Sequence, residues 1–330
     1  MRAAFIDRTG PPEVIRYDSL PDPSPGPGQV IVRTTALSVN PIDTYVRSGA
    51  VAFPITFPFV VGCDLAGTIA AVGSGVTRFS VGDRVWGSNQ GLLGRQGTFA
   101  ELVAVDPQWL YASPDGVSDE ALAATALVGI TAHLGLFRRA GLTPGETVLV
   151  SGGAGGVGSV VVQMAKAADA RVIATAGSDE RCEAARAFGA DTVVNYRSAD
   201  ADEQIRAAAP GGIDVYWETS RVADFDAIVG RLAENGRCVL MAGRDARPPF
   251  PVGPFYVKGC SLHGFAMFKA PSSEQRRCAD DIGRWLAEGK LRPNIALRLP
   301  LAEAKRAHEI QEENTLRAAG TLAGKIVLTP

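Results

Sequence analysis

The sequence predicts an α/β protein of two domains, one rich in antiparallel strands and one built on a doubly wound parallel sheet. Up to about residue 125, short β-branched runs such as Val30-Ile31-Val32 are separated by Gly and Pro, which is typical of antiparallel or barrel-like structure. From about residue 145, strand-like and helix-like runs alternate, as in a parallel sheet covered on both faces. The first of these strands enters a glycine-rich turn. We therefore assign residues 1–127 and 270–330 to the β-rich domain and residues 128–269 to the parallel-sheet domain.

Hydrophobic periodicity and glycine define the individual elements. In the β-rich domain, Gly67–Gly73 and Val81–Val85 are strand-like runs that meet glycine-dependent turns. The expected strands after residue 145 are Thr147–Val150, Arg171–Thr175, Thr192–Asn195, Ile213–Trp217, Arg237–Met241, Ser261–Phe265, Ile295–Leu299 and Lys325–Leu328. The expected helices are Gly156–Ala168, Glu180–Phe188 with Gly189 as its C-cap, Ser272–Glu288 and Leu301–Ile310.

Composition excludes several classes of function. Lys and Arg number 33 against 35 Asp and Glu, and no basic run follows the pattern of a nucleic-acid-binding surface, so nucleic acid is not the expected partner. No uninterrupted apolar run approaches the roughly 18 residues of a membrane span, and residues 1–5 do not begin a signal peptide. We expect a cytoplasmic protein whose cysteines are free thiols, since their spacing suits neither a zinc knuckle nor a redox pair. The five are Cys63, Cys182, Cys238, Cys260 and Cys278.

The glycine-rich turn carries the strongest functional signal in the sequence. A strand at residues 147–150 leads into Ser151-Gly152-Gly153-Ala154-Gly155-Gly156-Val157-Gly158, and a helical run follows. Gly153, Gly155 and Gly158 fit the G-x-G-x-x-G pattern, whose glycines allow a tight turn, close approach of a pyrophosphate and close helix–strand contact. The pattern stands at the start of an alternating strand and helix array, which favours a dinucleotide site over a simple glycine-rich corner.

The end of the second strand indicates which dinucleotide is bound. NAD-binding proteins place a carboxylate there for the ribose 2′-hydroxyl, whereas this strand ends at Ser178 without one. Asp179 and Glu180 fit better as acids in the first turn of a helix. Arg181 can offer a fork to a 2′-phosphate, and Tyr196 can close the same corner, although a solvated helix arginine is the alternative interpretation. We predict NADPH.

In the order and spacing of its motifs, the whole chain resembles the quinone oxidoreductase (ζ-crystallin-like) branch of the zinc-independent medium-chain dehydrogenase/reductase superfamily. The resemblance implies a GroES-like catalytic domain, a Rossmann domain that binds NADPH, and a dimer. The segments that carry it are Asn40 to Gly49, Gly62-Cys63-Asp64-Leu65-Ala66-Gly67, Val81-Gly82-Asp83-Arg84-Val85, Gly153 to Gly158 and Gly324-Lys325-Ile326-Val327-Leu328.

The resemblance also implies roles for individual residues. Asn40, Asp43 and Tyr45 match the segment that lines the nicotinamide and substrate cleft. Lys258 and Gly259 match a pair that opens the last Rossmann strand, while Arg221 and Arg244 depart from the family pattern near the nicotinamide ribose. The residues that we assign to the cofactor are Thr131, Gly153, Ala154, Gly155, Gly156, Val157, Gly158, Ser178, Arg181, Tyr196, Thr219 and Gly243.

A catalytic zinc is not expected. Zinc-dependent relatives place ligands at positions that correspond here to Asn40, Cys63 and the neighbourhood of Leu127. Cys63 alone is a plausible soft ligand, whereas a catalytic zinc needs about three protein ligands. The four-cysteine lobe of those relatives is also missing, since only the short run 87–98 is available for it. We predict no metal and interpret Cys63 as a buried small residue.

Without a metal or an evident base, the expected reaction is hydride transfer to an acceptor that is already polarised. Quinones and other conjugated carbonyls fit, with Tyr45 and Asn40 as candidate donors to the developing negative charge. An enoyl-thioester or other alkene reductase on the same scaffold is the nearest alternative. A nucleotide-binding protein with a structural or RNA-binding duty is another, and the near-neutral charge weighs against RNA.

Overall fold

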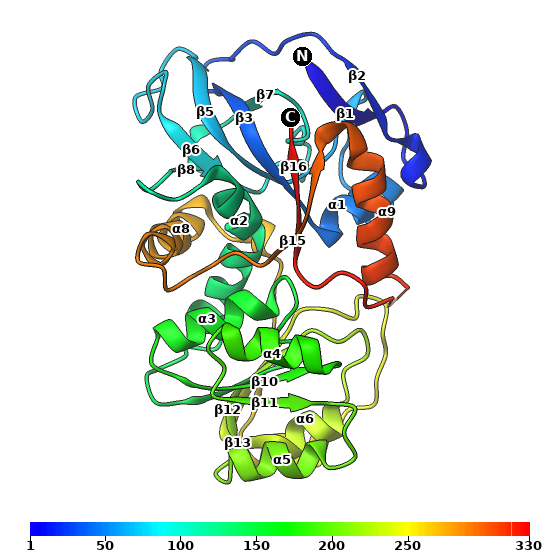
Figure 1. Cartoon of the computed structure of the whole chain (residues 1–330), viewed down its shortest axis with the longest axis vertical. Coiled ribbons are helices and arrows are strands. Elements are labelled where there is room, and N and C mark those ends of the chain that lie inside the picture. Colours follow the sequence, from blue (N-terminus) through cyan, green and yellow to red (C-terminus); the bar gives the residue numbers. More distant parts are fainter. Residues whose placement is uncertain (318) are drawn as a thin grey trace. The chain divides into compact units, whose positions relative to one another are not determined.

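The computed structural model describes residues 1–317 and 319–330 of the chain (Figure 1). Its internal contacts divide the chain into two units. The first unit comprises Met1–Val128, Ala270–Glu288 and Pro293–Pro330, and the second comprises Gly129–Lys269 and Gly289–Arg292. The sequence-based boundaries at 127/128 and 269/270 lie within one residue of this division. The short run Gly289–Arg292 lies within the segment 270–330 that the sequence places in the β-rich domain, and it groups with the second unit instead.

The first unit is built on strands that are mostly antiparallel. Its strands are β1 (Arg2–Ile6), β2 (Arg16–Ser19), β3 (Val30–Val39), β4 (Phe59–Val60), β5 (Asp64–Val72), β6 (Arg84–Gly87), β7 (Leu102–Val105), β8 (Leu110–Ala112), β15 (Ile295–Pro300) and β16 (Lys325–Thr329). Its helices are η1 (Pro12–Val14), α1 (Pro41–Ser48), η2 (Pro107–Trp109), α8 (Ser272–Ala287), η5 (Leu301–Glu303) and α9 (Ala304–Thr315). Helix α2 (Asp119–His133) starts in this unit and ends in the second.

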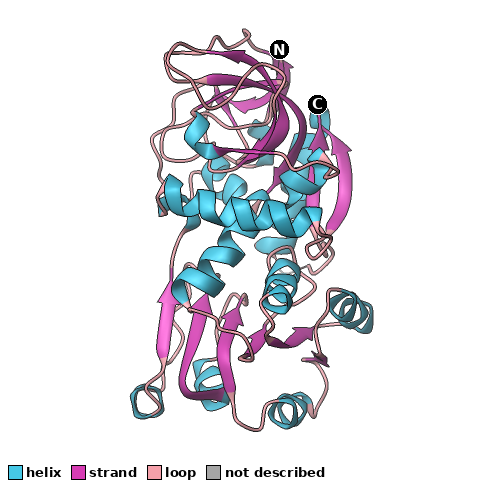
Figure 2. Ribbon diagram, turned by 90° about the vertical axis from the view of Figure 1, so that its left-hand side faces the viewer, coloured by secondary structure: helices cyan, strands magenta, loops and turns pink. Residues whose placement is uncertain are grey.

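The main sheet of the first unit has seven strands in the order β15-β16-β3-β5-β6-β8, with β7 also paired to β3. Its long, curved strands can be followed in Figure 2. Strands β3 and β5 form the centre because β-branched and aliphatic side chains bury both faces over much of their length. Gly67 allows the two strands to approach, since a Cβ there would lie 2.1 Å from the Arg33 carbonyl oxygen. The predicted β-rich architecture is therefore confirmed.

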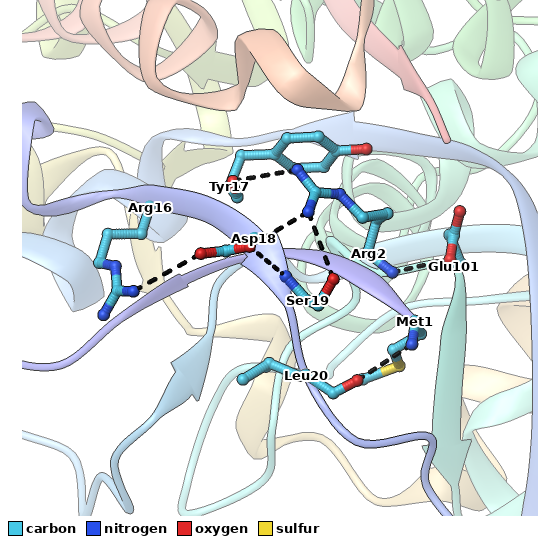
Figure 3. A network of polar contacts seen from close by, with 8 residues as sticks. All are labelled: Met1, Arg2, Arg16, Tyr17, Asp18, Ser19, Leu20 and Glu101. Carbon is cyan, nitrogen blue, oxygen red and sulfur yellow. Dashed lines mark hydrogen bonds and ion pairs between the residues drawn. The ribbon is translucent and has the colours of Figure 1, made fainter.

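A small second sheet in this unit has the order β2-β1-β4. Arg2, on its middle strand β1, contacts residues of the edge strand β2 (Figure 3). The guanidinium of Arg2 donates to Asp18 Oδ1 at 3.1 Å and lies 4.5 Å from the centre of the Tyr17 ring. The backbone N–H of Arg2 donates to Glu101 Oε2 at 2.7 Å. The Arg2 and Asp18 side chains are 40% and 56% exposed, so their ion pair contributes little stability and mainly fixes how β1 pairs with β2.

The second unit is built on one sheet of six parallel strands. Its strands are β9 (Thr147–Val150), β10 (Arg171–Ala176), β11 (Thr192–Asn195), β12 (Ile213–Glu218), β13 (Leu232–Leu240) and β14 (Ser261–Gly264). Its helical segments are η3 (Leu134–Arg139), α3 (Gly158–Ala167), α4 (Asp179–Ala187), α5 (Ala201–Ala208), α6 (Phe225–Arg231), α7 (Val252–Val257) and η4 (Met267–Lys269).

The strand order β11-β10-β9-β12-β13-β14 becomes 3-2-1-4-5-6 when the strands of this unit are counted from β9. This is the doubly wound order of dinucleotide-binding sheets, in which the direction of winding reverses beside the first strand. Helices α3 and α4 lie on one side of the sheet and α5 and α6 on the other (Figure 1). The predicted doubly wound sheet is therefore confirmed. Gly189 follows the end of α4 and has a φ of +98°, as expected of a glycine that terminates a helix.

Two expectations about elements need correction. Strand β13 begins at Leu232, whereas the sequence suggested a start at Arg237. In sequence, residues 233–236 look like a turn. In the structure they belong to β13, where the pairing with β12 shifts register between Ile213 and Val215 and Asn235 has a φ of 59°. The helix expected from Leu301 begins instead as the short 3-10 turn η5 and becomes α-helical only at Ala304.

The continuous helical segment Asp119–Arg139 is long and apolar on average, although Thr125, Thr131 and His133 interrupt its apolar run. Among the described residues, it is the one helix long and apolar enough to cross a membrane by length and composition, although 72% of its apolar window is buried inside the protein. Burial of this extent is what a core helix of a folded domain requires, because such a helix packs apolar side chains on most of its circumference. The segment is therefore weak support for a membrane span.

Candidate functional site

The glycine-rich turn lies at the carboxyl end of β9, beside the point where the strand order reverses. Backbone hydrogen bonds connect it to both neighbouring strands, from Ser151 N to Trp217 O and from Gly153 N to Thr175 O, each 2.9 Å long. The hydroxyl of Thr219 donates to the Ser151 carbonyl oxygen at 2.8 Å. Ligands of doubly wound sheets bind outside this end of the strands, so the turn stands where a dinucleotide would be held.

Each glycine of the turn meets a different steric demand. A Cβ at Gly158 would lie 2.1 Å from the Gly152 carbonyl oxygen, and a Cβ at Gly153 would lie 2.6 Å from the Ala174 Cβ, so both positions exclude a side chain. At Gly155 a Cβ would lie 3.2 Å from the Gly152 carbonyl oxygen, a tight contact but less severe than those at Gly153 and Gly158. The absence of a side chain at Gly155 instead suits a group that approaches the backbone from outside, as a pyrophosphate does.

The turn also presents unused hydrogen-bond donors at the start of α3. Within the described residues, the backbone N–H groups of Gly156 and Val157 have no acceptor. Val157 is the N-cap of α3, and no side chain caps that end. Free N–H groups and the positive end of the helix dipole together favour an anion. The residues of the turn therefore fit the pyrophosphate of a dinucleotide.

The tip of β10 carries no carboxylate for a ribose 2′-hydroxyl. Asp179 begins α4, and its Oδ1 accepts a hydrogen bond of 3.2 Å from Asn195 Nδ2, as expected for an acid in the first turn. Ser178 caps α4 by accepting from Arg181 N at 3.4 Å. The phenol oxygen of Tyr196 covers Gly177, where a Cβ would lie 2.2 Å from it. The corner therefore combines a half-buried arginine on α4 with a tyrosine hydroxyl.

A second arginine lies at the same corner. Arg197 is exposed, and its guanidinium carbon lies 6.0 Å from the centre of the Tyr196 ring. Sequence reasoning missed Arg197, although its position directly after Tyr196 was the available signal. Arg181 and Arg197 bring two positive charges to this corner against the carboxylate of Asp179, which Asn195 holds at 3.2 Å, and this balance suits a phosphate.

The other residues assigned to the cofactor lie at different places in the second unit. The hydroxyl oxygen of Thr219 is 3.0 Å from the position of a Cβ on Gly152, so Thr219 contacts the glycine turn. Gly243 has a φ of +79° after β13, and a Cβ there would lie 2.5 Å from the Arg221 carbonyl oxygen. The side chain of Arg244 lies 3.7 Å from the exposed carboxylate of Asp245. Thr131 is buried on α2, and Ala154 is buried within the turn.

In the first unit, the candidate catalytic residues begin at the end of β3. Asn40 follows β3 directly and precedes α1, which carries Asp43 and the half-buried Tyr45. Strand β3 lies between β16 and β5, with Val39 opposite Ile326 and Ser38 opposite Asp64. This pairing brings the start of β16, the end of β3 and the start of β5 to one end of the sheet. Lys325, Asn40 and Asp64 consequently gather there.

These side chains form a buried polar cluster made of Asn40, Asp43, Cys63, Asp64 and Lys325, each at most 5% exposed. Asn40 Nδ2 donates to Asp64 Oδ2 at 2.7 Å, and Asn40 N donates to Asp43 Oδ2 at 2.8 Å. Lys325 Nζ donates to Asn40 Oδ1 and, at 2.7 Å, to the Val39 carbonyl oxygen. The amide of Asn40 is thus held on both sides by charged groups.

Burial dominates the electrostatics of the cluster. It raises the pKa of the Asp43 carboxyl to about 7 and also raises the pKa of Asp64, with the ammonium of Lys325 opposing both shifts. It raises the pKa of the Cys63 thiol well above its usual range, and the two carboxylates act in the same direction. It lowers the pKa of Lys325. Cys63 is therefore a neutral thiol at physiological pH.

The donor set of this cluster does not fit a catalytic zinc. Zinc binds cysteine as the thiolate, and burial together with two carboxylates stabilises the neutral thiol of Cys63. Lys325 places a positive charge among the same groups. Across residues 1–317 and 319–330, no group of three or more His, Cys, Asp and Glu side chains is arranged to hold a metal ion.

Comparison with known proteins identifies the family. Residues 26–115 match the family model described as "Alcohol dehydrogenase GroES-like domain", and residues 156–282 match the one described as "Zinc-binding dehydrogenase". A quinone oxidoreductase from Pseudomonas aeruginosa is 35% identical over 97% of this chain and 97% of its own length. The chain belongs to the quinone oxidoreductase branch of the medium-chain dehydrogenase/reductase superfamily. The predicted resemblance is confirmed, and the protein is an oxidoreductase.

Similar proteins carry names that indicate different activities and cofactors. A 2-haloacrylate reductase from a Burkholderia species is 30% identical over 99% of this chain and 98% of its own length. A solved structure of an NAD-dependent alcohol dehydrogenase has a TM-score of 0.89 and 32% identity, and a mycobacterial protein complexed with NADPH has a TM-score of 0.85 and 32% identity. Both structures align over 100% of this chain and 100% of their own. The superfamily fold is thus certain, while cofactor and substrate depend on residues of this chain.

Two further residues of the site were not found from the sequence of this oxidoreductase. Gly152 has a φ of +72°, and it precedes the three glycines of the recognised pattern, none of which has a positive φ. The run of two adjacent glycines was the signal for a left-handed residue there. Lys325 was noted only as part of a closing strand, because a single lysine more than 280 positions from Asn40 gives no local pattern.

Proposed function

We propose that this oxidoreductase uses NADPH to reduce quinones or other conjugated carbonyls without a metal. The observation that carries the proposal is the corner beside the glycine turn, where β10 ends without a carboxylate and Tyr196 covers Gly177 next to Arg181. A carboxylate at that tip would repel a 2′-phosphate, whereas an arginine and a phenol attract it. The solved NADPH complex of the mycobacterial relative supports this choice.

The residues of the second unit would divide the binding of NADPH between them. The N–H groups of Gly156 and Val157 would hold the pyrophosphate, and Arg181, Tyr196 and Ser178 would surround the 2′-phosphate. We propose that Thr219, Gly243 and Thr131 contact the nicotinamide end of the cofactor. A bound reduced nicotinamide supplies the hydride.

In the first unit, Asn40 and Tyr45 are proposed to stabilise the negative charge that develops on the substrate oxygen. One N–H of the Asn40 amide is used by Asp64 at 2.7 Å, and the same nitrogen has only a long contact of 3.4 Å to the Ser38 carbonyl oxygen. A contact of that length is weak, so the second N–H is the donor left for a substrate oxygen, which would reach the fully buried Asn40 by displacing the groups that cover it. Asp43, which accepts from the Asn40 backbone, would hold the start of α1.

A second candidate function is alkene reduction of a conjugated acid or thioester. The similarity to a 2-haloacrylate reductase over nearly the whole chain favours it specifically. The same cofactor site and the same polarised acceptor serve both reactions, because the hydride goes to a carbon conjugated with a carbonyl in one case and to a quinone in the other. The two candidate functions differ in the acceptor that is preferred, which is a quinone or enone in the first and a conjugated acid or thioester in the second.

A substrate panel tests the proposed function and metal independence together. We expect chelator-treated protein with well under one zinc per chain to oxidise NADPH with quinones or enones as acceptors, since the donor set does not suit zinc. Loss of NADPH absorbance is measured for quinones, enones, enoyl thioesters and 2-haloacrylate. Activity that returns only with added zinc would contradict metal independence, and turnover confined to thioesters or 2-haloacrylate would favour the second candidate.

We also propose that the protein is a cytoplasmic homodimer associated through the edge of the parallel sheet. Strand β14 is the last strand in the sheet order, and its Leu262 is exposed. An unpaired edge with an apolar side chain favours pairing with a symmetry-related copy. Five free cysteines suit a reducing compartment.

Light scattering at micromolar concentration should therefore give the mass of a dimer. Leu262→Lys should shift the protein toward the monomer, because a charge on an edge strand opposes strand pairing. Exposed Val222→Lys, outside the sheet edge, serves as the matched control and should remain dimeric. A monomeric wild-type protein would refute the proposed assembly.

A further inference from the structure

The contacts of Lys325 single it out within the buried polar cluster. Its side chain comes from the first residue of β16 and is 5% exposed. The ammonium makes two hydrogen bonds, to the Val39 carbonyl oxygen at 2.7 Å and to Asn40 Oδ1. No carboxylate lies within ion-pair distance of it among the described residues. The amide of Asn40 therefore stands between the ammonium of Lys325 and the carboxylate of Asp64.

This arrangement allows one orientation of the Asn40 amide. Its oxygen faces an ammonium, which only donates, and its nitrogen faces a carboxylate, which accepts when ionised. The opposite orientation would place the NH₂ group against the ammonium and the carbonyl against the carboxylate, so both contacts would become repulsive. Charged partners on opposite sides thus fix which end of the amide donates.

The ammonium also affects the strength of that donor. A cation bound to the oxygen of an amide withdraws electron density from its nitrogen, and linked hydrogen bonds strengthen one another in a low-dielectric interior. The N–H of Asn40 that has only the 3.4 Å contact to Ser38 becomes a better donor to an oxyanion. This is the group that the proposed function assigns to the substrate.

We propose that Lys325 is a positioning residue for the reduction, which orients and polarises the amide of Asn40. The inference rests on the proposed function, because it gives the Asn40 amide a role only if that amide meets the substrate. Lys325 itself does not touch the substrate. Its effect on turnover passes through Asn40, and Asp64 completes the arrangement on the opposite side.

The variants must separate this role from a structural one. Lys325→Met alone leaves the buried Asp64 carboxylate without a neighbouring cation, which is strongly destabilising. Combining it with Asp64→Asn removes both charges and keeps the volumes similar. We expect the double variant to remain folded, to bind NADPH as wild type does in a fluorescence titration, and to lose about tenfold to a hundredfold in kcat.

A mutational cycle with Asn40 then shows whether Lys325 acts through that amide. Asn40→Ala should lower kcat to a similar extent, and adding Lys325→Met and Asp64→Asn to it should cause no further loss, because residues that act as a unit are not additive. A triple variant in which the losses multiply would overturn the proposal. A double variant with wild-type kcat would also overturn it.

Hydrogen exchange of the Asn40 side-chain amide supplies a readout that needs no substrate. We expect its NMR signal, assigned by its disappearance in Asn40→Ala, to exchange slowly in wild type and rapidly in the double variant. Unchanged protection in the double variant would contradict the positioning role. If wild-type protein reduces none of the panel compounds, the proposed function fails, while this measurement still decides whether Lys325 orients Asn40.

Discussion

Replacing Arg181 with alanine is expected to lower kcat/KM for NADPH by about one to two orders of magnitude and to change the kinetics with NADH little. A charge-assisted contact to a phosphate contributes about 1.5 to 3 kcal/mol, and each 1.36 kcal/mol corresponds to about tenfold. NADH has no 2′-phosphate for Arg181 to bind. Steady-state kinetics with both cofactors measure the effect, which should shrink at high salt because a half-buried contact is partly screened.

Arg186→Ala is the matched control, because it removes an arginine from the last turn of the same helix, where Arg186 pairs with Glu183. It should leave both cofactors unaffected. Equal losses with NADPH and NADH in Arg181→Ala would indicate that Arg181 supports the helix rather than the phosphate. A wild-type preference for NADH would overturn the cofactor assignment itself.

His308 should make the protein progressively less stable as the pH falls below about 6.5. Its imidazole is fully buried on α9, with the Phe99 ring 5.9 Å away, and burial together with the charge of Arg47 lowers its pKa to about 3. Between the two pKa values the unfolded chain binds a proton that the folded protein does not, so its stabilising contribution is complete above about pH 6.5 and is lost on acidification. The loss is about 1.4 kcal/mol per pH unit, or roughly 3 kcal/mol by pH 4.5.

Comparison with His308→Gln isolates this contribution, because other buried groups titrate in the same range. The raised pKa of Asp43 acts in the opposite direction, since its contribution to stability is lost as the pH rises toward about 7. Free energies of unfolding, measured by denaturant titration from pH 7.5 to 4.5, should converge between the two proteins as the pH falls. Curves that stay parallel would show that His308 is not buried in its neutral form.

Much of the fold could be predicted because local signals and tertiary structure agree in the parallel sheet. The expected strands at 147–150 and 192–195 match the buried β9 and the edge strand β11, since short apolar runs bounded by turns predict strands. The start of β13 was missed because Asn235 and Gly236 read as a turn. There the pairing with β12, with its shift of register, overrides local propensity.

The candidate site divides in the same way. The glycine turn is one contiguous run, and the corner follows at the ends of the next two strands, so the residue pattern and the family resemblance predicted both. The cluster around Asn40 depends on pairing between strands far apart in the chain, and Lys325 reaches Asn40 only because β16 inserts beside β3. Sequence spacing carries no information on such pairing, which explains why the amide of Asn40 was identified without the groups that hold it.

The insertion of β16 beside β3 also affects how the protein is made. Residues 129–269 form nearly all of the second unit as one continuous stretch, so its sheet can fold as soon as that stretch leaves the ribosome. The first unit stays incomplete much longer, because Lys325 binds Val39 across 286 positions of sequence. Until β16 emerges, the 37–39 end of β3, which β7 does not cover, is an open edge available to other chains. Slow completion of this sheet would be the step of biosynthesis most exposed to aggregation. The buried polar cluster assembles only after β16 has paired with β3, because Lys325 is part of both.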